Sequence, residues 1–197
     1  MVVMENYFKF IRFFNMKNYM LTKDNIQLRI PEPDDIGFLL NMENDSDLWA
    51  VSNTHNPFSR FDIEQYILLY DKDIYSAKQL RFMIVAVGID KPHSIGAIDI
   101  FDFDAHNKRA GVGISIIENQ RNKGYAGVAL DILVKYMFSH LNLHQIYCNI
   151  GEDNHKSISL FKSRGFIEAG IKKDWNLRNN RWIDEHIFQL LVTSFLP

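Results

Sequence analysis

A glycine-containing turn after an apolar strand pattern is the part of this sequence best suited to chemistry. The stretch from Ile114 to Gly127 passes through a polar loop into a long helical pattern that begins at Gly124. The first turn of a helix carries free backbone N–H groups and a partial positive charge, so it can hold phosphate oxygens. Small residues there let a ligand approach the backbone, and Arg121 and Lys123 add positive charge. The pattern predicts a phosphate-binding turn.

A second polar segment follows after one more helix and one more strand. Residues 154–166 read NHKSISLFKSRGF, in which Asn154 is suited to cap a helix and Gly165 to end it. Each segment has a plain structural alternative when taken alone, namely a solvated basic loop and a simple helix cap.

Hydrophobic periodicity predicts the elements that position both segments. Alternating or β-favouring runs predict strands at residues 26–30, 80–87, 95–103, 110–117, 144–150, 166–175 and 182–191. Helical spacing or caps predict helices at residues 31–42, 62–72, 126–141 and 154–164. One strand–helix–strand unit within an otherwise antiparallel pattern predicts a mixed, mostly antiparallel sheet flanked by helices. The fold class is therefore α/β (α+β).

Composition excludes several classes of function. The 197 residues carry 22 Lys and Arg against 24 Asp and Glu, which leaves no basic excess for nucleic acid. No apolar stretch approaches the roughly 20 residues that span a bilayer, and the seven histidines show no metal-ligand spacing. The single cysteine, Cys148, excludes an internal disulfide and favours a reducing compartment. We expect a cytoplasmic protein without metal, membrane or nucleic-acid partner.

Residues 21–197 show no repeat or linker and are expected to form one domain. Residues 1–20 read as an N-terminal extension in which phenylalanines alternate with basic residues. A short amphipathic helix that docks on the domain or on a partner is one interpretation. The other is a translation start further along, at Met16 or Met20.

The two polar segments resemble those of the GNAT family of acetyl-CoA-dependent N-acetyltransferases. Residues 121–126 fit R-x-x-G-x-A, and residues 154–166 follow at the family's separation. The run Asn107-Lys108-Arg109-Ala110 adds a likeness to the spermidine/diamine and ribosomal-protein N-terminal acetyltransferases. The resemblance covers about residues 26–191. It implies a single GNAT-like domain that uses acetyl-CoA as co-substrate.

The resemblance also implies a set of coenzyme contacts. Backbone amides of the turn would hold the pyrophosphate, the main chain before the turn would pair with the pantetheine arm, and the last helix would line the channel. Asn154 would both cap its helix and bind the arm, with pure capping as the alternative. The implied residues are Ile116, Ile117, Arg121, Asn122, Lys123, Gly124, Tyr125, Ala126, Gly127, Asn154, Ser157 and Phe161.

Two positions depart from the family pattern. Phe161 stands where many relatives carry a tyrosine that protonates the leaving thiolate, and Gly111 stands where the polyamine enzymes often carry a glutamate. Three explanations stay open: catalysis by proximity and water, replacement of both roles by other residues, or binding of acetyl-CoA without efficient turnover. The candidate replacements are Asp99, Asp102 or Glu118 as base and Tyr125 or Tyr147 as proton donor.

Asp99 and Asp102 are the catalytic candidates that we select. Both lie on or at the end of a strand that leads towards the expected acceptor cleft, although a solvated surface position is the alternative for each. Their odd separation would place them on opposite faces of a regular strand. We therefore expect at most one of them to point into the site.

Acidic residues give a further indication of the acceptor. Six acids and no Lys or Arg lie between Pro31 and Ser59, in the segment that the resemblance places beside the acceptor entrance. Such a wall would attract a cationic amine, although a solvated helix face is the alternative. The expected acceptor is a small-molecule amine, with a polyamine favoured and a peptide N-terminus as the alternative. The exposed terminal hairpin makes a homodimer reasonable.

Overall fold

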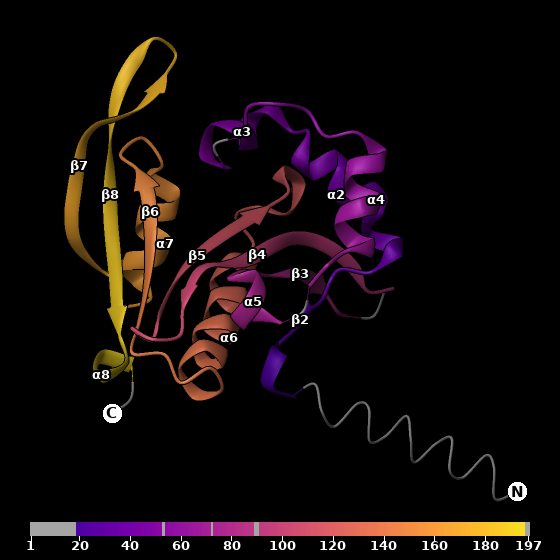
Figure 1. Ribbon diagram of the computed structural model, residues 1–197, viewed down its shortest axis with the longest axis horizontal. Coiled ribbons are helices and arrows are strands. Elements are labelled where there is room, and N and C mark those ends of the chain that lie inside the picture. Colours follow the sequence, from indigo (N-terminus) through magenta and orange to yellow (C-terminus); the bar gives the residue numbers. More distant parts are fainter. Residues whose placement is uncertain (1–18, 53, 72, 89–90, 196–197) are drawn as a thin grey trace, which may run out of the picture.

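The computed structural model describes residues 19–52, 54–71, 73–88 and 91–195 (Figure 1). Residues 1–18, which include most of the expected extension, lie outside the described part. The strands are β1 (Thr22–Lys23), β2 (Ile26–Arg29), β3 (Leu80–Ala86), β4 (His93–Asp104), β5 (Arg109–Ile116), β6 (Gln145–Gly151), β7 (Ile167–Arg178) and β8 (Arg181–Leu191). The α-helices are α2 (Ile36–Glu43), α3 (Ser46–Ser52), α4 (Arg60–Leu68), α5 (Ile74–Ala77), α6 (Tyr125–Ser139), α7 (His155–Ser163) and α8 (Val192–Phe195). Short 3₁₀ turns are η1 (Tyr19–Leu21), η2 (Pro33–Asp35) and η3 (Glu118–Gln120).

The strands form one sheet in the order β1-β2-β3-β4-β5-β6-β8-β7. Every neighbouring pair in it is antiparallel except β5 with β6, which are parallel and connected through α6. The expected mixed, mostly antiparallel sheet is therefore confirmed. The strand–helix–strand unit lies at its centre, as the sequence pattern predicted.

Helices cover the sheet on both faces (Figure 1). On one face, Leu130, Leu133 and Met137 of α6 are fully buried in the larger core cluster, to which α7 also contributes. On the other face, α2 and α4 pack over β3 and β4 in a second cluster that includes Leu39 and Ile63. Successive side chains of a strand point to opposite faces of the sheet, so one strand can contribute residues to both clusters. None of the helices in the described ranges is long and apolar enough to cross a bilayer.

The connection between β2 and β3 differs from the sequence prediction. The expected helix over residues 62–72 runs from Arg60 to Leu68, and two further helices, α3 and α5, lie between β2 and β3. Both additional helices have seven residues or fewer, too short for a periodic pattern. In contrast, the expected turn between the last two strands is confirmed, because Asn179 and Asn180 both take a positive φ.

Candidate active site

Strands β5 and β6 part after a short stretch of pairing. They pair only from Arg109 with Gln145 to Gly111 with Tyr147. Beyond this apex β5 continues to Ile116 and β6 to Gly151 with no ladder between them in the described structure (Figure 1). The main chain of β5 that faces the gap is therefore open to a ligand that adds as a strand.

The turn that opens α6 presents a run of free amides. Gly124 is the N-cap of α6 in the left-handed conformation, at a φ of 82°. Within the described residues, the backbone N–H groups of residues 122–126 donate to no backbone carbonyl. The amide of Arg121 donates to Glu118 (3.1 Å) and that of Gly127 donates to Gly124 (3.1 Å). The free-amide turn, residues 122–126, is thus narrower than the expected span but begins the helix as the sequence predicted.

The turn is tied to the end of β5. The guanidinium of Arg121 donates from Nε to the carbonyl of Ile116 (2.9 Å). Both main-chain groups of Ile117 are engaged, because its N–H donates to Ile95 (3.0 Å) and its carbonyl accepts from Gln120 (3.0 Å). The open edge of β5 therefore lies ahead of Ile117.

The two glycines of the turn differ in what surrounds them. A Cβ added at Gly124 would have no heavy atom within 4 Å, so this residue faces open space. A Cβ at Gly127 would lie 2.2 Å from Nη2 of Arg164, whose Nε donates to Asp131 (2.8 Å). Gly127 is buried and makes room for this ion pair. Ligand approach to the backbone is thus available at Gly124, whereas at Gly127 the arginine occupies that space.

Helix α7 begins beside the parted end of β6. Asn154 caps it, with Oδ1 accepting from the amide of Ser157 (3.1 Å). No hydrogen bond from Nδ2 of Asn154 is found among the described residues, which leaves that amide free to donate to a ligand. Phe161 is only 3% exposed and packs edge-on against Phe166, with ring centroids 5.0 Å apart. Its position in the core corrects the expectation that it lines an open channel.

An aromatic ring covers β5 at the apex. A Cβ at Gly111 would lie 2.2 Å from the ring of Phe101, which comes from the neighbouring strand β4. The same ring meets Tyr147 edge-on, with centroids 5.8 Å apart. The space above Gly111 is therefore filled by Phe101, and a glutamate side chain at this position has no room.

Asp99 is held in an ion pair on the face of the sheet below α2. Its two carboxylate oxygens accept from Nε and Nη2 of Arg81, at 2.7 and 3.0 Å. Arg81 also donates to Glu43 of α2 (2.5 Å). Burial works against the charge on Arg81, but Asp99 and Glu43 raise its pKa above the usual value. Asp99 is thus a carboxylate whose charge is already balanced.

Asp102 lies in an irregular part of β4. Its φ is 49°, and the pairing of β4 with β5 shifts register between Phe101 and Asp104. Its carboxylate accepts from the hydroxyl of Tyr147 (2.9 Å), whose ring contacts Phe101. Because the bulge interrupts the alternation, Asp102 reaches the same face as Asp99. The expectation of opposite faces, which assumed a regular strand, is wrong.

The comparisons with known proteins agree with this geometry. The family model described as the acetyltransferase (GNAT) domain matches residues 25–167. The chain belongs to the GNAT acetyltransferase family. It is 26% identical to the spermidine N(1)-acetyltransferase of Vibrio cholerae over 172 residues, which are 87% of this chain and 95% of that protein. It is 28% identical to the uncharacterized N-acetyltransferase p20 of Bacillus licheniformis over 176 residues, 89% of this chain and 97% of that one.

The fold of this acetyltransferase is also found among solved structures. The crystal structure of the Vibrio cholerae spermidine N-acetyltransferase in complex with CoA and spermine superposes with a TM-score of 0.79. The match covers 89% of this chain and all of that chain, at 24% sequence identity. The expected family, fold and activity class are therefore confirmed. Among the described residues, no group of three or more His, Cys, Asp or Glu side chains is arranged to hold a metal ion.

The acidic segment of the acetyltransferase is less free than its sequence indicates. Asp35 is 3% exposed and pairs with Arg29 (2.6 Å), and Glu43 pairs with Arg81. Two more acids accept backbone N–H groups at turns, namely Glu32 and Asp45. The carboxylates of Asp34 and Asp47 accept no hydrogen bond from the described residues. Arginines from outside the segment thus neutralise part of the wall.

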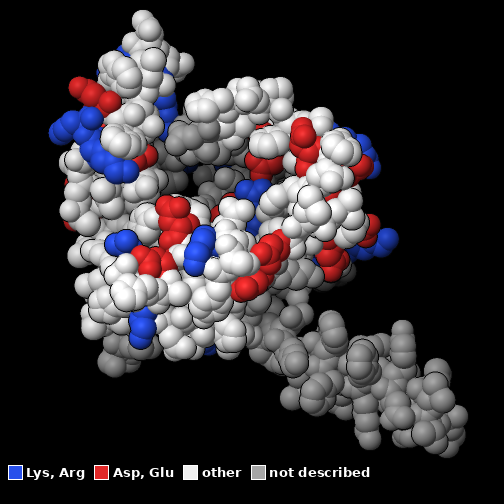
Figure 2. All heavy atoms as spheres, in the orientation of Figure 1, with Lys and Arg blue, Asp and Glu red and all other residues white. Residues whose placement is uncertain are grey.

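Sequence reasoning missed Phe101 and Arg81, which contact Tyr147 and Asp99, respectively. A signal for Phe101 was present, because glycines at 111 and 113 within a strand indicate that another group approaches the backbone closely. Arg81 carried no local signal, since its partners come from α2 and β4. Figure 2 shows the surface hollowed between the projecting β7–β8 hairpin and α3.

Proposed function

We propose that this acetyltransferase moves the acetyl group of acetyl-CoA directly to a primary amine of a small, polyamine-like molecule. The observation that carries the proposal is the parting of β5 and β6 beside the free-amide turn. The amides of residues 122–126 would bind the pyrophosphate, helped by the positive end of α6. Asn154 would hydrogen-bond the arm of the coenzyme through its free amide. The wider set of proposed contacts is Ile116, Arg121 and Ser157, because Arg164 covers Gly127, Phe161 is buried against Phe166, and the main chain of Ile117 is already hydrogen-bonded.

The open edge of β5 suits the pantetheine arm. The unpaired stretch from Val112 to Ile116 spans about 13 Å at about 3.3 Å per residue, so it can run beside most of an extended pantetheine. With the pyrophosphate at the turn, the thioester would reach the apex at Gly111 and Tyr147. This arrangement supports a ternary complex in which the amine attacks the thioester carbonyl with no covalent enzyme intermediate.

Proximity would supply much of the rate. Holding an amine against a thioester in the right geometry is worth several kcal/mol. A backbone N–H of β5 would stabilise the negative charge that develops on the carbonyl oxygen. Phe161 has no proton to give to the leaving thiolate, so proton transfer must use other groups or water.

The acceptor class is supported from two sides. Relatives that match most of this chain are named spermidine N(1)-acetyltransferases, from Vibrio cholerae and Escherichia coli. The carboxylates of Asp34 and Asp47 have no hydrogen-bond partner among the described residues, and they would attract a polycation to the acidic segment. The proposal includes self-association, which is supported by the dodecameric structure of the Vibrio cholerae enzyme.

Release of free CoA thiol across a panel of polyamines, amino acids and basic peptides tests this function. We expect turnover with polyamines. Gly124→Glu should abolish it, because a carboxylate at the free-amide turn would repel the pyrophosphate. A second readout is the Tm with saturating acetyl-CoA, since a ligand at 100 times its Kd stabilises the folded state by about 2.7 kcal/mol.

Three results of this assay would correct the proposal in different ways. Turnover with peptides alone would identify an N-terminal acetyltransferase. A rise in Tm with acetyl-CoA but no turnover on any acceptor would identify an acyl-CoA-binding protein. If acetyl-CoA neither raises the Tm nor supports turnover, the proposed coenzyme site is wrong.

A further inference from the structure

A row of three residues crosses the apex where β5 and β6 begin to part. Phe101, Gly111 and Tyr147 occupy successive positions on β4, β5 and β6. Because Gly111 has no side chain, the ring of Phe101 lies across β5 and meets Tyr147 edge-on at 85°. Tyr147 is therefore fixed beside the last paired position, where the proposed thioester would end.

The hydroxyl of Tyr147 points at one carboxylate. It donates to Oδ2 of Asp102 at 2.9 Å, across the strand that separates the two residues in the sheet. The left-handed backbone of Asp102 makes this contact possible, since it turns the side chain out of the regular alternation. No hydrogen bond to Oδ1 of Asp102 is made by a described residue, so that oxygen can take a proton.

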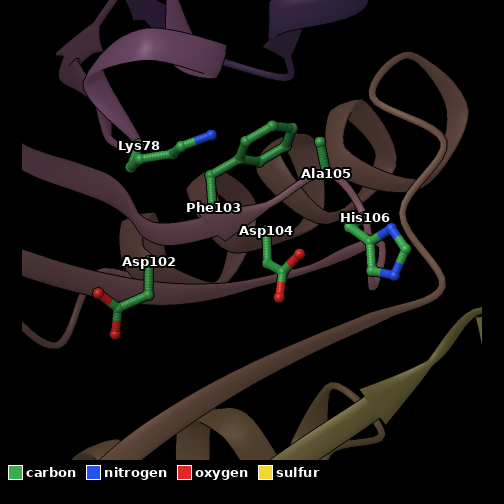
Figure 3. A pocket seen from close by; sticks show the side chains of 6 residues that line it. All are labelled: Lys78, Asp102, Phe103, Asp104, Ala105 and His106. Carbon is green, nitrogen blue, oxygen red and sulfur yellow. The ribbon is translucent and has the colours of Figure 1, made fainter.

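Charged residues line the hollows around Asp102, but none of the described ones forms an ion pair with it. A hollow of about 490 Å³ contains Asp102 and Tyr147, with Asp104, Arg109, Gln145 and Gln189 among its other lining residues. Arg109 is paired with Asp104 (3.3 Å). The adjoining hollow adds Lys78 and His106 (Figure 3). In Figure 3 the side chains of Asp102 and Asp104 leave the strand on the side opposite Phe103 and Lys78.

Asp99, the other aspartate on this face, differs from Asp102 because it is held in an ion pair. Both of its oxygens accept from Arg81, which is itself fixed by Glu43. Taking up a proton would break this pairing and leave Arg81 with less compensation in a partly buried position. Asp102 has no such partner cation among the described residues and is the better acceptor of a proton.

We propose that Asp102 takes the proton from the acceptor ammonium and that Tyr147, held between Asp102 and the apex, returns a proton to the departing sulfur. The inference rests on the proposed function and deepens it, because it assigns the roles left vacant by Gly111 and Phe161. Asp102 and Tyr147 together form the proton-transfer pair.

The step balances as follows in atoms and charge. The ammonium gives one proton to Asp102, and the free amine forms a C–N bond with the thioester carbonyl carbon. The C–S bond breaks, and its electron pair leaves on sulfur, while the acetylated nitrogen releases its second proton to water. Tyr147 protonates the sulfur as it takes the proton held by Asp102. Burial and Asp102 raise the pKa of Tyr147 to about 12, so a coupled transfer avoids a free tyrosinate.

Asp102→Asn and Tyr147→Phe test the pair by steady-state kinetics over a pH series. Asparagine tolerates the left-handed backbone that Asp102 adopts, so the bulge should persist. We expect kcat to fall about 100-fold in Asp102→Asn near neutral pH, with the KM for the amine and the Kd for acetyl-CoA unchanged. The loss should shrink towards about pH 9, because solvent then supplies neutral amine.

Matched controls separate this role from a structural one. Asp24→Asn changes another aspartate at positive φ, and Tyr75→Phe changes an exposed tyrosine; both should retain wild-type rates. The double variant should be no slower than the slower single variant, because residues that act as a unit are not additive. An unchanged pH profile, a rise in KM alone, or fully additive losses would overturn the proposal. Absence of transfer by the wild-type protein would instead overturn the proposed function, and the inference with it.

Discussion

Gly111 and Gly124 are both small residues of the site, but different physical reasons require them. Gly124 adopts a φ of 82° with open space around it, so its constraint is backbone conformation. Gly111 has no positive φ, and its constraint is the ring of Phe101 that lies over it. One glycine thus permits a turn, and the other permits an aromatic ring to cross a strand. The ring of Phe101 occupies the space that a glutamate side chain at this position would need.

Gly111→Ala tests this packing at the residue scale. We expect a loss of about 2 kcal/mol in the free energy of unfolding, because the added methyl overlaps the ring of Phe101. Urea denaturation measures it. Phe101→Leu removes the ring that the methyl overlaps. In that background, Gly111→Ala should therefore lower the free energy of unfolding by much less than it does in wild type.

Gly37→Ala is the control for this substitution. Gly37 lies in α2, and its added Cβ would have no heavy atom within 4 Å. Alanine restricts the unfolded chain more than glycine does, which is worth about 0.4–1 kcal/mol where the native conformation suits alanine. This variant should therefore be at least as stable as wild type. Equal stability of the two alanine variants would contradict the overlap at Gly111.

At the scale of elements, Asp35 connects the end of β2 to the start of α2. It is 3% exposed, and it accepts from Arg29 at the end of β2, from Ser94 on β4 and from the amide of Glu32. Burial alone would raise the pKa of Asp35, but the hydrogen bonds from Arg29, Glu32 and Ser94 lower it overall. The carboxylate therefore fixes where α2 starts relative to the sheet, and so where Glu43 meets Arg81.

Asp35→Asn should destabilise the protein by about 2 kcal/mol at neutral pH, because charge-assisted hydrogen bonds to a buried group are lost. The folded pKa of Asp35 is lower than the unfolded value of about 3.9, so its contribution is present above that value. It is lost as the pH falls through the folded pKa. The gap in Tm between wild type and variant should therefore narrow in acid.

Asp34→Asn is the comparison for this pH series. Its carboxylate is exposed and makes no hydrogen bond with the described residues, so the Tm should match wild type throughout. A gap for Asp35→Asn that stays constant down to about pH 2 would show that the charge of Asp35 is not what stabilises the junction.

At the scale of the whole molecule, the sheet ends in a long hairpin with an open edge. Among the described residues, strand β7 pairs only with β8, and the hairpin projects beyond the end of β6 (Figure 1). Leu177 and Trp182 face each other across it and are 57% and 60% exposed. An exposed apolar edge strand is a template for pairing with another chain. This surface is where we place the proposed self-association.

Light scattering coupled to gel filtration measures this association. We expect a mass of at least twice that of the chain for wild type and a lower mass for Leu177→Lys, because a charge on the edge strand β7 opposes pairing. Leu69→Lys is the control. Leu69 is 75% exposed and follows α4, far along the chain from the hairpin, so this variant should leave the mass unchanged. A monomeric wild-type protein would contradict the association.

The sequence by itself determined those features that depend on neighbours within a few residues. The order of the long elements, the helix start at Gly124, the cap at Asn154 and the turn at Asn179-Asn180 all follow from local patterns. Each of them reflects backbone conformation or capping, which short segments fix on their own. The family and its activity class followed because its motif lies in these local features.

Only the tertiary structure decided which side chains meet at the proposed acceptor side. Arg81 reaches Asp99 and Glu43 from a strand that the acidic segment does not include, and Tyr147 reaches Asp102 across 45 residues of sequence. A single bulge changes which face Asp102 occupies, and no short-range pattern marks it. Contacts between distant strands depend on register and on the volume of facing side chains, and these are set only when the sheet assembles.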